Sequence, residues 1–339
     1  KNLLSTKGSP LQIDSGSNTN HDFLEEINPP GTGAESTGVV TRFSIDKPSP
    51  HKDFPVRIHL LGIKDLIIIF SDSYFSDLES MSEYPSKVEF EEHVNSIDME
   101  FQNSTLSQDF IIDDDILDIQ DYFEKNFKTY SFYVDFIKES KFWYKLANLF
   151  HKIPPNSLVK AFEILWGKNP HLSSLFSLLV SELEKISFEK IAFAPFSSVL
   201  RNHGEILDVQ RLKELYDNED KITIIVGGNQ KEINLCRISA LSAQLVLHIS
   251  GDINKSKPFL NNTDLLDFPG ARSRLDLIAS NIDQKAIPDM YLRGKIAYLF
   301  NKYSSDFEIN NLLFCINDKQ LDVNEIPSLL NEWIKNNIG

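Results

Sequence analysis

Stretches with the residue pattern of β-strands occur in two parts of the chain. Two early stretches, Gly38–Ile45 and Val56–Leu61, are rich in β-branched residues or alternate between apolar and polar positions. Three later ones, Lys221–Gly227, Glu232–Ser239 and Gln244–Ile249, have the same character. Because a period of two and β-branched side chains are typical of strands, each stretch predicts a β-strand.

Between these two groups the apolar residues change to helical spacing. The pattern is clear in Lys64–Ser71, Phe123–His151, Ser157–Gly167 and Leu172–Ile186. It predicts a mostly helical insertion. We interpret the many aromatic residues there as the core of a helix bundle rather than as a ligand cage.

The last part of the chain combines both patterns. Phe259–Leu266 has strand character, Met290–Tyr303 predicts an amphipathic helix, and Ile326–Ile338 predicts another helix. Asn311–Ile316 is a continuous apolar run, as expected for an interior parallel strand. Strands separated by helices predict an α/β fold.

Three regions follow from these patterns. Residues 1–36 are polar and rich in Gly, Ser, Asn and Pro, which is typical of an exposed loop. We expect an N-terminal part of an α/β domain in residues 1–63, the helical insertion in 64–215, and the remainder of the α/β domain in 216–339.

Net charge, cysteine content and the length of apolar runs indicate which partners and which compartment to expect. The formal net charge is −15, which repels nucleic-acid phosphates, so we expect no nucleic-acid partner. The two cysteines, Cys236 and Cys315, lie among apolar residues and favour buried thiols in a reducing cytoplasm over a disulfide. Apolar runs such as Leu66–Phe70 have the length of strands, so no transmembrane segment is predicted.

The chain starts at Lys1 without a visible signal peptide, and we interpret it as lacking its natural N-terminus.

Part of a nucleoside-triphosphate site is visible in the sequence. The phosphate-binding pattern G-x-x-x-x-G-K-S/T is absent, so this chain has no P-loop. Thr41, however, follows a Gly-rich loop at the start of a strand, where its hydroxyl could bind Mg²⁺ and its N–H could meet a γ-phosphate. Asp267 follows an apolar strand, and Gly270, three residues later, would let the backbone approach a phosphate closely.

The D-x-x-G pattern at Asp267 also fits an ordinary Asp…Pro-Gly turn. The pair formed by Gly-x-Val-Thr-Arg and Asp-x-Pro-Gly resembles the switch regions of dynamin-like GTPases. A closer resemblance is to the SrfC-type putative bacterial virulence factor family. It rests on four stretches: residues 23–31, 35–43, 206–209 and 263–274.

This resemblance implies a P-loop NTPase-like sheet, that of a dynamin-like G domain, with a large helical insertion. It also implies a longer parent protein with the P-loop just upstream of Lys1, with GTP and Mg²⁺ as ligands and Thr41, Asp267 and Gly270 as the nucleotide- and Mg²⁺-sensing residues. Hydrolysis of a nucleoside triphosphate is expected only if that upstream P-loop is supplied. Arg42, Arg272 and Arg274 are candidate phosphate or interface contacts, and solvated loop charges are the alternative.

The segment that would recognise the base departs from the GTPase pattern. Guanine recognition usually rests on N/T-K-x-D, whereas here Lys319 and Asp322 are one residue too far apart. An altered base site and a lost one both remain open. A degenerate, non-hydrolysing scaffold that docks proteins or copies of itself through the aromatic insertion is therefore the competing hypothesis, and secretion as an effector is left open.

Other candidate sites are better explained by structure. Asp113-Asp114-Asp115 precedes an apolar segment and fits the start of a helix better than a metal site. His59 and His248 lie in strand patterns without a Cys, His or Glu partner at metal-ligand spacing, so we expect core or edge histidines.

Overall fold

The structure is a computed structural model of the 339-residue chain. It describes residues 10–17, 19–29, 37–79, 84–127, 130–201, 206–249, 253–270, 275, 277–313, 331 and 333–334. The chain forms two compact units. The first unit contains residues 1–61 and 185–270, and the second contains residues 62–184 and 271–339.

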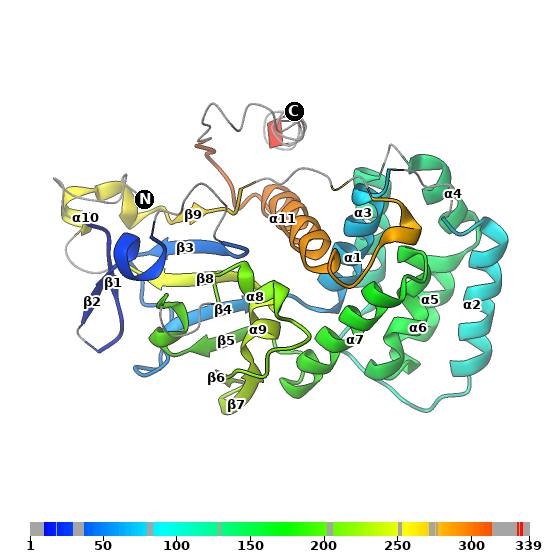
Figure 1. Cartoon of the computed structure of the whole chain (residues 1–339), viewed down its shortest axis with the longest axis horizontal. Helices are drawn as coiled ribbons and strands as arrows, with labels where there is room; N and C mark the ends of the chain where they lie inside the picture. Colours follow the sequence, from blue (N-terminus) through cyan, green and yellow to red (C-terminus); the bar gives the residue numbers. More distant parts are fainter. Residues whose placement is uncertain are drawn as a thin grey trace. The chain divides into compact units, whose positions relative to one another are not determined.

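A seven-stranded mixed sheet is the centre of the first unit (Figure 1). The strand order is β7-β6-β5-β4-β8-β3-β9. The strands are β3 (Val40–Ser44), β4 (Val56–Leu60), β5 (Ile191–Ala194), β6 (Lys221–Val226), β7 (Asn229–Asn234), β8 (Ser242–His248) and β9 (Leu265–Asp267). A small separate sheet pairs β1 (Gln12–Asp14) with β2 (Asn20–Asp22).

Most neighbouring strands of the large sheet run antiparallel. Among the described residues, β3 and β8 are the one parallel pair, and the other five pairings are antiparallel. The expectation of a mixed α/β chain with a large helical part is therefore confirmed. The mostly parallel sheet of a P-loop NTPase is not what these residues form, because five of the six strand pairings are antiparallel.

Residues in register across the sheet point to the same face, and successive residues along a strand point to opposite faces. One row across the strands is Val226, Ala192, Ile58, Leu245, Thr41 and Asp267. The next row, on the opposite face, is Ile225, Phe193, Arg57, Val246, Arg42 and Leu266. We call the first the covered face and the second the polar face.

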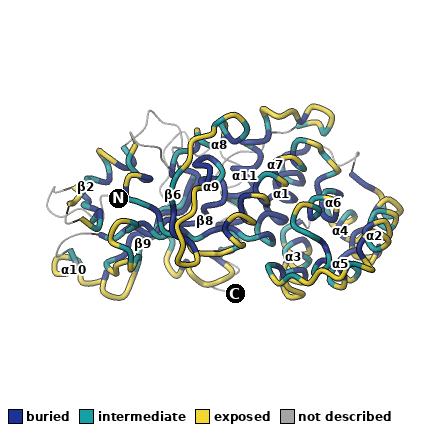
Figure 2. The backbone as a smooth tube through the Cα atoms, turned by 90° about the horizontal axis from the view of Figure 1, so that it is seen from below, coloured by how far each residue is buried: buried dark blue, intermediate teal, exposed yellow. Residues whose placement is uncertain are grey.

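The covered face packs against the N-terminal segment of the first unit. The turn η2 (Phe23–Ile27) begins at Asp22, whose carboxylate accepts hydrogen bonds from the backbone N–H groups of residues 24 and 25. Phe23 is fully buried and contacts Phe43 edge to face, with ring centroids 4.9 Å apart. In Figure 2, β8 is drawn as buried along nearly its whole length. The short helices α8 (Gln210–Lys213), α9 (Leu235–Leu241) and α10 (Ile253–Ser256) complete the first unit.

The second unit is almost entirely helical. Its helices are α1 (Ile63–Asp77), α2 (Lys87–Phe101), α3 (Asp113–Asn126), α4 (Ser131–Glu139), α5 (Phe142–Leu149), α6 (Leu158–Phe162), α7 (Pro170–Lys185) and α11 (Ile287–Ser305). The fully buried Phe70 contacts the rings of Trp166, Phe176 and Tyr291 at centroid distances of 5.4 to 5.5 Å, and Trp166 contacts Phe176 at 5.1 Å. The aromatic residues of this region thus form a core, as the sequence predicts.

Helices α1 and α11 pack closely at a glycine. A Cβ atom added to Gly294 would lie 2.8 Å from the carbonyl oxygen of Ile69 and would overlap the hydroxyl of Ser73. Near this contact the guanidinium of Arg293 forms a buried ion pair with Asp77. Burial raises the pKa of Asp77, and the positive charge of Arg293 opposes that shift.

Most predicted elements are confirmed, with several differences. The expectation of an exposed loop in residues 1–36 is wrong for its described part, because β1, β2 and η2 form there and Leu11, Ile13 and Phe23 are buried. Glu232–Ser239 is only partly strand: β7 ends at Asn234, whose side chain accepts a hydrogen bond from the N–H of Arg237 and caps α9. In Asn311–Ile316, residues 311–313 are not a strand and Leu313 is 76 % exposed, while 314–316 lie outside the described residues. Phe259–Leu266 begins with the turn η8 (Pro258–Asn261), so the strand is shorter than expected.

Other predictions cannot be judged on the described residues. The predicted helix Ile326–Ile338 lies almost entirely outside them. The three-region division also stays a prediction, although β5 lies within 64–215 and belongs to the sheet. Among the described residues, no helix combines the length and apolar character needed to cross a bilayer.

Candidate functional site

Thr41 and Asp267, the two residues that the sequence singles out, lie opposite each other in the sheet. Thr41 is the second residue of β3, Asp267 is the last residue of the edge strand β9, and the two are antiparallel register partners. Cβ atoms of such partners lie about 5 Å apart on the same face. The Thr41 hydroxyl and the Asp267 carboxylate therefore project from the covered face side by side.

The two side chains differ in exposure. Thr41 is 2 % exposed, and none of the described residues forms a hydrogen bond with its hydroxyl. Asp267 is half-buried, as is Gly270, which follows the strand at the end of the described segment.

A third stretch meets the start of β3. Thr37 forms an isolated antiparallel bridge with Asp208, and the N–H of Gly38 donates to the carbonyl of Leu207 at 3.2 Å. Residues 37–41, 206–208 and 264–270 therefore belong to one unit. These are three of the stretches on which the family resemblance rests, and the fold joins them through β3.

What this arrangement can do chemically is limited by its ligands. Mg²⁺ in phosphate-binding sites typically takes one or two protein oxygens and completes its shell with water and phosphate. Thr41 and Asp267 offer such a pair. Among the described residues, no cluster of three or more His, Cys, Asp or Glu side chains is placed to hold a metal. The pair would therefore bind Mg²⁺ together with a phosphate rather than alone.

Arg42, a predicted phosphate or interface contact, lies on the opposite face of the sheet from Thr41 and Asp267. Arg42 lies one residue after Thr41 and hence on the polar face, where its guanidinium pairs with Asp264 at 3.2 Å. The side chains of Thr41 and Arg42 therefore point to opposite faces of the sheet. Arg272, Arg274, Lys319 and Asp322 lie outside the described residues.

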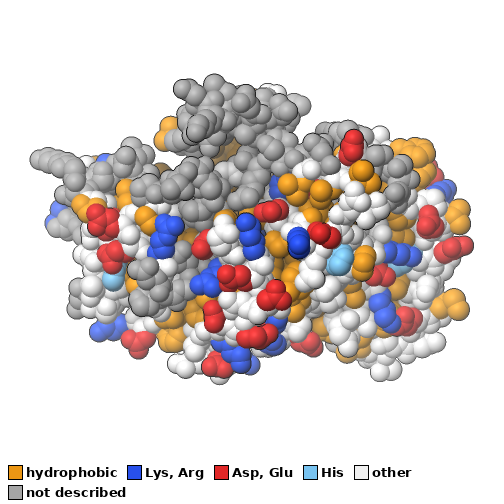
Figure 3. Space-filling view, in the orientation of Figure 1, with side chains coloured by type: hydrophobic (Ala, Val, Ile, Leu, Met, Phe, Trp, Pro, Cys, Tyr) orange, Lys and Arg blue, Asp and Glu red, His pale blue; other side chains and the backbone are white. Residues whose placement is uncertain are grey.

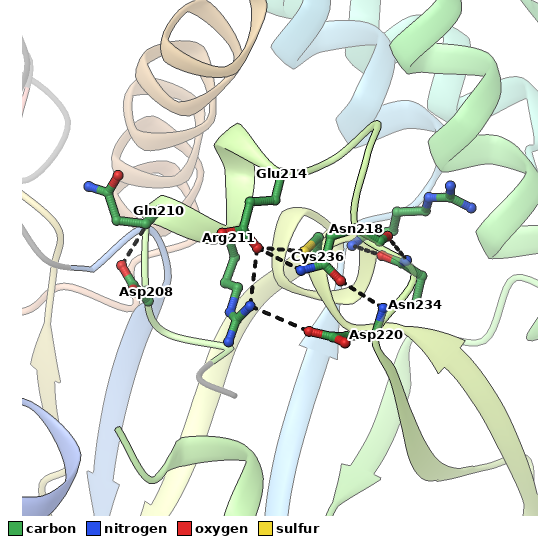
Figure 4. Close-up of polar contacts among 9 residues, drawn as sticks. Asp208, Gln210, Arg211, Glu214, Asn218, Asp220, Asn234 and Cys236 are labelled. Atoms are coloured by element: carbon green, nitrogen blue, oxygen red, sulfur yellow. Dashed lines mark hydrogen bonds and ion pairs between the residues drawn. The ribbon is translucent and has the colours of Figure 1, made fainter. Parts of the chain in front are cut away.

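A polar cluster continues from Asp208 (Figure 4). The Arg211 guanidinium lies 3.1 Å from the Glu214 carboxylate and 3.8 Å from that of Asp220. The Asn218 amide donates to the same Glu214 oxygen at 2.7 Å. The Asn234 amide at the start of α9 donates to the carbonyl of Asn218, and the N–H of Gln210 donates to the Asp208 carboxylate, so the cluster links Asp208 to the start of α9.

Cys236 lies at the centre of this cluster. Its Sγ is 3.9 Å from the Glu214 carboxylate, and its side chain is fully buried. Burial raises the pKa of the Cys236 thiol to about 11, and the Glu214 carboxylate adds to the shift. Because the thiolate is the reactive form, this thiol is not a nucleophile at neutral pH.

The remaining sequence candidates have structural explanations. The aspartates 113–115 form the first turn of α3, where the Asp115 carboxylate accepts a hydrogen bond from the N–H of Ile112. His248 at the end of β8 contacts the Asp14 carboxylate at 3.1 Å and the Ile45 carbonyl at 3.0 Å. His59 is a half-buried strand residue in register with Gln244.

One arrangement was not identified from the sequence as a site. Arg57 and Phe193 are register partners on the polar face, with the guanidinium carbon 5.9 Å from the ring centroid. The alternation Val-Arg-Ile-His-Leu in β4 was the available signal, since it places Arg57 and His59 on one face. Phe193 could not be paired with them because β5 was not predicted.

Both units contribute to the stretch of chain that matches a known family. The family described as "Putative bacterial virulence factor" matches residues 3–339. This chain belongs to that family. No curated protein and no solved structure matches the chain.

For this virulence-factor family member, the match spans the Thr41, Asp208 and Asp267 segments alike. The description of the family names bacteria and virulence and contains no GTPase. The part of the resemblance that concerns dynamin-like GTPases and nucleotides is therefore still a prediction.

Proposed function

We propose that this virulence-factor family member is a nucleotide-dependent switch or assembly module that uses Mg²⁺ and GTP, with ATP as the alternative nucleotide. In this proposal the Thr41 hydroxyl and the Asp267 carboxylate bind Mg²⁺, directly or through water, and the backbone at Gly270 approaches the γ-phosphate. The register pairing of Thr41 with Asp267 carries the proposal. Two residues distant in sequence, each suggested by a switch motif, are neighbours on one face.

The bridge between Thr37 and Asp208 offers a route for the switch. Loops that sense a γ-phosphate change their order when the nucleotide is hydrolysed. A change at Thr41 would reach Asp208 through two or three residues of the same chain segment, and from there the Arg211–Glu214 cluster. Other proteins or further copies of the chain would then bind according to whether the first unit holds a nucleoside triphosphate.

Hydrolysis requires more than these residues. A P-loop lysine and a loop of backbone N–H groups stabilise the transferred phosphate in known NTPases. In this proposal these groups come from residues outside 1–339, and the protein acts in the cytoplasm, where GTP and Mg²⁺ are present.

Calorimetry tests this function. Mg²⁺-GTP and Mg²⁺-ATP are titrated into the chain and into the parent protein that includes the preceding residues, each checked for folding by circular dichroism. The proposal requires saturable binding of one nucleotide by the parent protein. Absence of binding of both nucleotides by the folded parent protein would refute it.

A second function is favoured by the surface of the helical unit. Phe132 on α4 is 64 % exposed and contacts the tilted ring of Phe136 at a centroid distance of 4.2 Å, and Tyr144 on α5 is 72 % exposed. Exposed aromatic side chains are enriched where proteins bind one another. In this alternative the chain is a non-hydrolysing scaffold, and the helical unit binds a partner protein or a second copy.

A further inference from the structure

The polar face of the sheet contains an arginine, Arg57, that has no acidic partner among the described residues. Arg57 is half-buried in the middle of β4, and its Nε is buried without a hydrogen bond. No described residue forms an ion pair or a side-chain hydrogen bond with its guanidinium. This is unexpected in a chain with 49 acidic and 34 basic residues.

Arg42 shares the buried Nε without a hydrogen bond and differs from Arg57 in having a carboxylate partner. Arg42 and Arg57 lie on the same face, one on each side of Val246 in β8. Arg42 has a carboxylate partner, Asp264, at 3.2 Å. Nothing in the register therefore prevents an arginine on this face from being paired, but among the described residues Arg57 is not.

Arg57 is held by an aromatic ring instead. Its guanidinium carbon lies 5.9 Å from the centroid of Phe193, its partner on β5, and the imidazole of His51 contacts the same ring at 5.2 Å. Arg57, Phe193 and His51 form what we call the arginine platform. An aromatic ring fixes the plane of a guanidinium without using its N–H groups, so these remain available to a planar oxyanion.

Apolar side chains beside the platform indicate what kind of group would lie next to an oxyanion bound at Arg57. Phe193 is half-buried, and Ile191, two residues before it on the same strand and face, is 42 % exposed. Val246, between the two arginines, is apolar as well. A ligand with an acidic head for Arg57 and a flat or apolar body for Phe193 and Ile191 matches both features.

We propose that the arginine platform is a binding site for a small organic oxyanion, a phosphate or carboxylate with an apolar or aromatic body. The guanidinium of Arg57 binds the acid group through two parallel N–H···O hydrogen bonds, and Phe193 packs against the body. The site is on the opposite face from Thr41 and Asp267, so it is independent of the proposed Mg²⁺-nucleotide site.

Ligand-observed NMR titration tests the proposal with three probes: phenyl phosphate, benzoate and inorganic phosphate. Phenyl phosphate and benzoate distinguish the two acid groups, and inorganic phosphate lacks the apolar body. We expect saturable binding of at least one of the two aromatic probes. We expect Arg57→Met to weaken it at least several-fold, because methionine keeps the apolar stem but has no N–H groups. Lys221→Met, which removes an exposed lysine of the same unit, is the matched control and should bind like wild type.

A second variant separates charge from stacking. Phe193→Leu should weaken binding of the aromatic probes and leave that of inorganic phosphate nearly unchanged. Failure of wild type to bind either aromatic probe would overturn the proposal, and so would equal binding by wild type and Arg57→Met.

Thermal unfolding of Arg57→Met gives an independent readout. Arg57→Met loses the contact with the Phe193 ring but no ion pair or hydrogen bond to a described residue, so its Tm should be only slightly below that of wild type. A clearly lower Tm would mean that the guanidinium is satisfied inside the protein, and this outcome also overturns the proposal.

Discussion

Thr41 and Asp267 are register partners on β3 and β9, although one precedes and the other follows the whole helical segment α1–α7 in the sequence. Their side chains project from the same face of the sheet, and the Thr41 hydroxyl makes no hydrogen bond with any described residue. The register pairing brings a hydroxyl and a carboxylate from distant parts of the sequence side by side, as a ligand shared by the two requires.

Gly294 should be intolerant of even a methyl group. Alanine normally stabilises a helix relative to glycine, by about 1 kcal/mol. At Gly294 the added Cβ would lie 2.8 Å from the carbonyl oxygen of Ile69 on α1, and this backbone atom cannot move without displacing the helix. We therefore expect Gly294→Ala to lower the free energy of unfolding by about 2 kcal/mol in urea titrations, since overpacking of a close contact typically has this cost. Ser305→Ala, at the exposed end of the same helix, is the control and should change stability little.

Lys295 should make stability depend on pH. Burial lowers its pKa from 10.5 to about 7. Between these values the unfolded chain binds a proton at Lys295 that the folded chain does not, so the free energy of unfolding rises with pH. The expected slope is about 1.4 kcal/mol per pH unit above pH 7. Urea unfolding from pH 7 to pH 9 of wild type and Lys295→Met measures it as the difference between the two proteins. A difference that does not change with pH would show that Lys295 stays protonated in the folded state.

Cys236 should be unreactive until the chain unfolds. Its side chain is fully buried, and its thiol has a pKa of about 11, so the thiolate is scarce at neutral pH. In a Cys315→Ser background, a thiol-specific chromogenic reagent should detect no thiol in native protein at pH 7.5 within minutes and one thiol in urea. Rapid reaction of the native protein would instead point to a functional thiol beside Glu214.

The exposed aromatic residues of α4 decide whether the helical unit acts as a docking surface. If Phe132 takes part in self-association, Phe132→Ser should shift the molar mass measured by light scattering towards that of the monomer. It should leave the Tm nearly unchanged, because Phe132 is 64 % exposed. Lys138→Ser, an exposed residue of the same helix, is the control. Identical masses for all three proteins would remove self-association from the scaffold hypothesis.

The sequence predicted elements well where one pattern dominated. In β4 and β6 the alternation of β-branched residues indicated only a strand. In α1, α7 and α11 the spacing of apolar residues indicated only a helix. Glu232–Ser239 was misread because Asn234 ends a strand and caps a helix within one apolar stretch. A period of two and a period of 3.6 cannot be separated over so few residues.

The site was predicted only in part for a different reason. Thr41 and Asp267 could be paired because each belongs to a recognisable motif. Arg57 and Phe193 come from strands whose adjacency depends on β5, a four-residue strand. Strand order in a mixed sheet is a tertiary property, so no local pattern could have placed Phe193 beside Arg57.

Binding of Mg²⁺-nucleotide to matched variants of the parent protein tests the central claim most directly. Thr41→Val keeps the shape and removes the hydroxyl, and Asp267→Asn keeps the size and removes the charge. We expect calorimetry to show that each variant binds GTP, or ATP if that is the ligand, at least tenfold more weakly than wild type, a loss of about 1.4 kcal/mol. Thr41→Val should keep the Tm close to that of wild type, since it keeps the shape and the Thr41 hydroxyl forms no hydrogen bond with a described residue. Ser44→Ala, on the opposite face of the same strand, should bind like wild type. Unchanged nucleotide affinity in both Thr41→Val and Asp267→Asn would contradict the account.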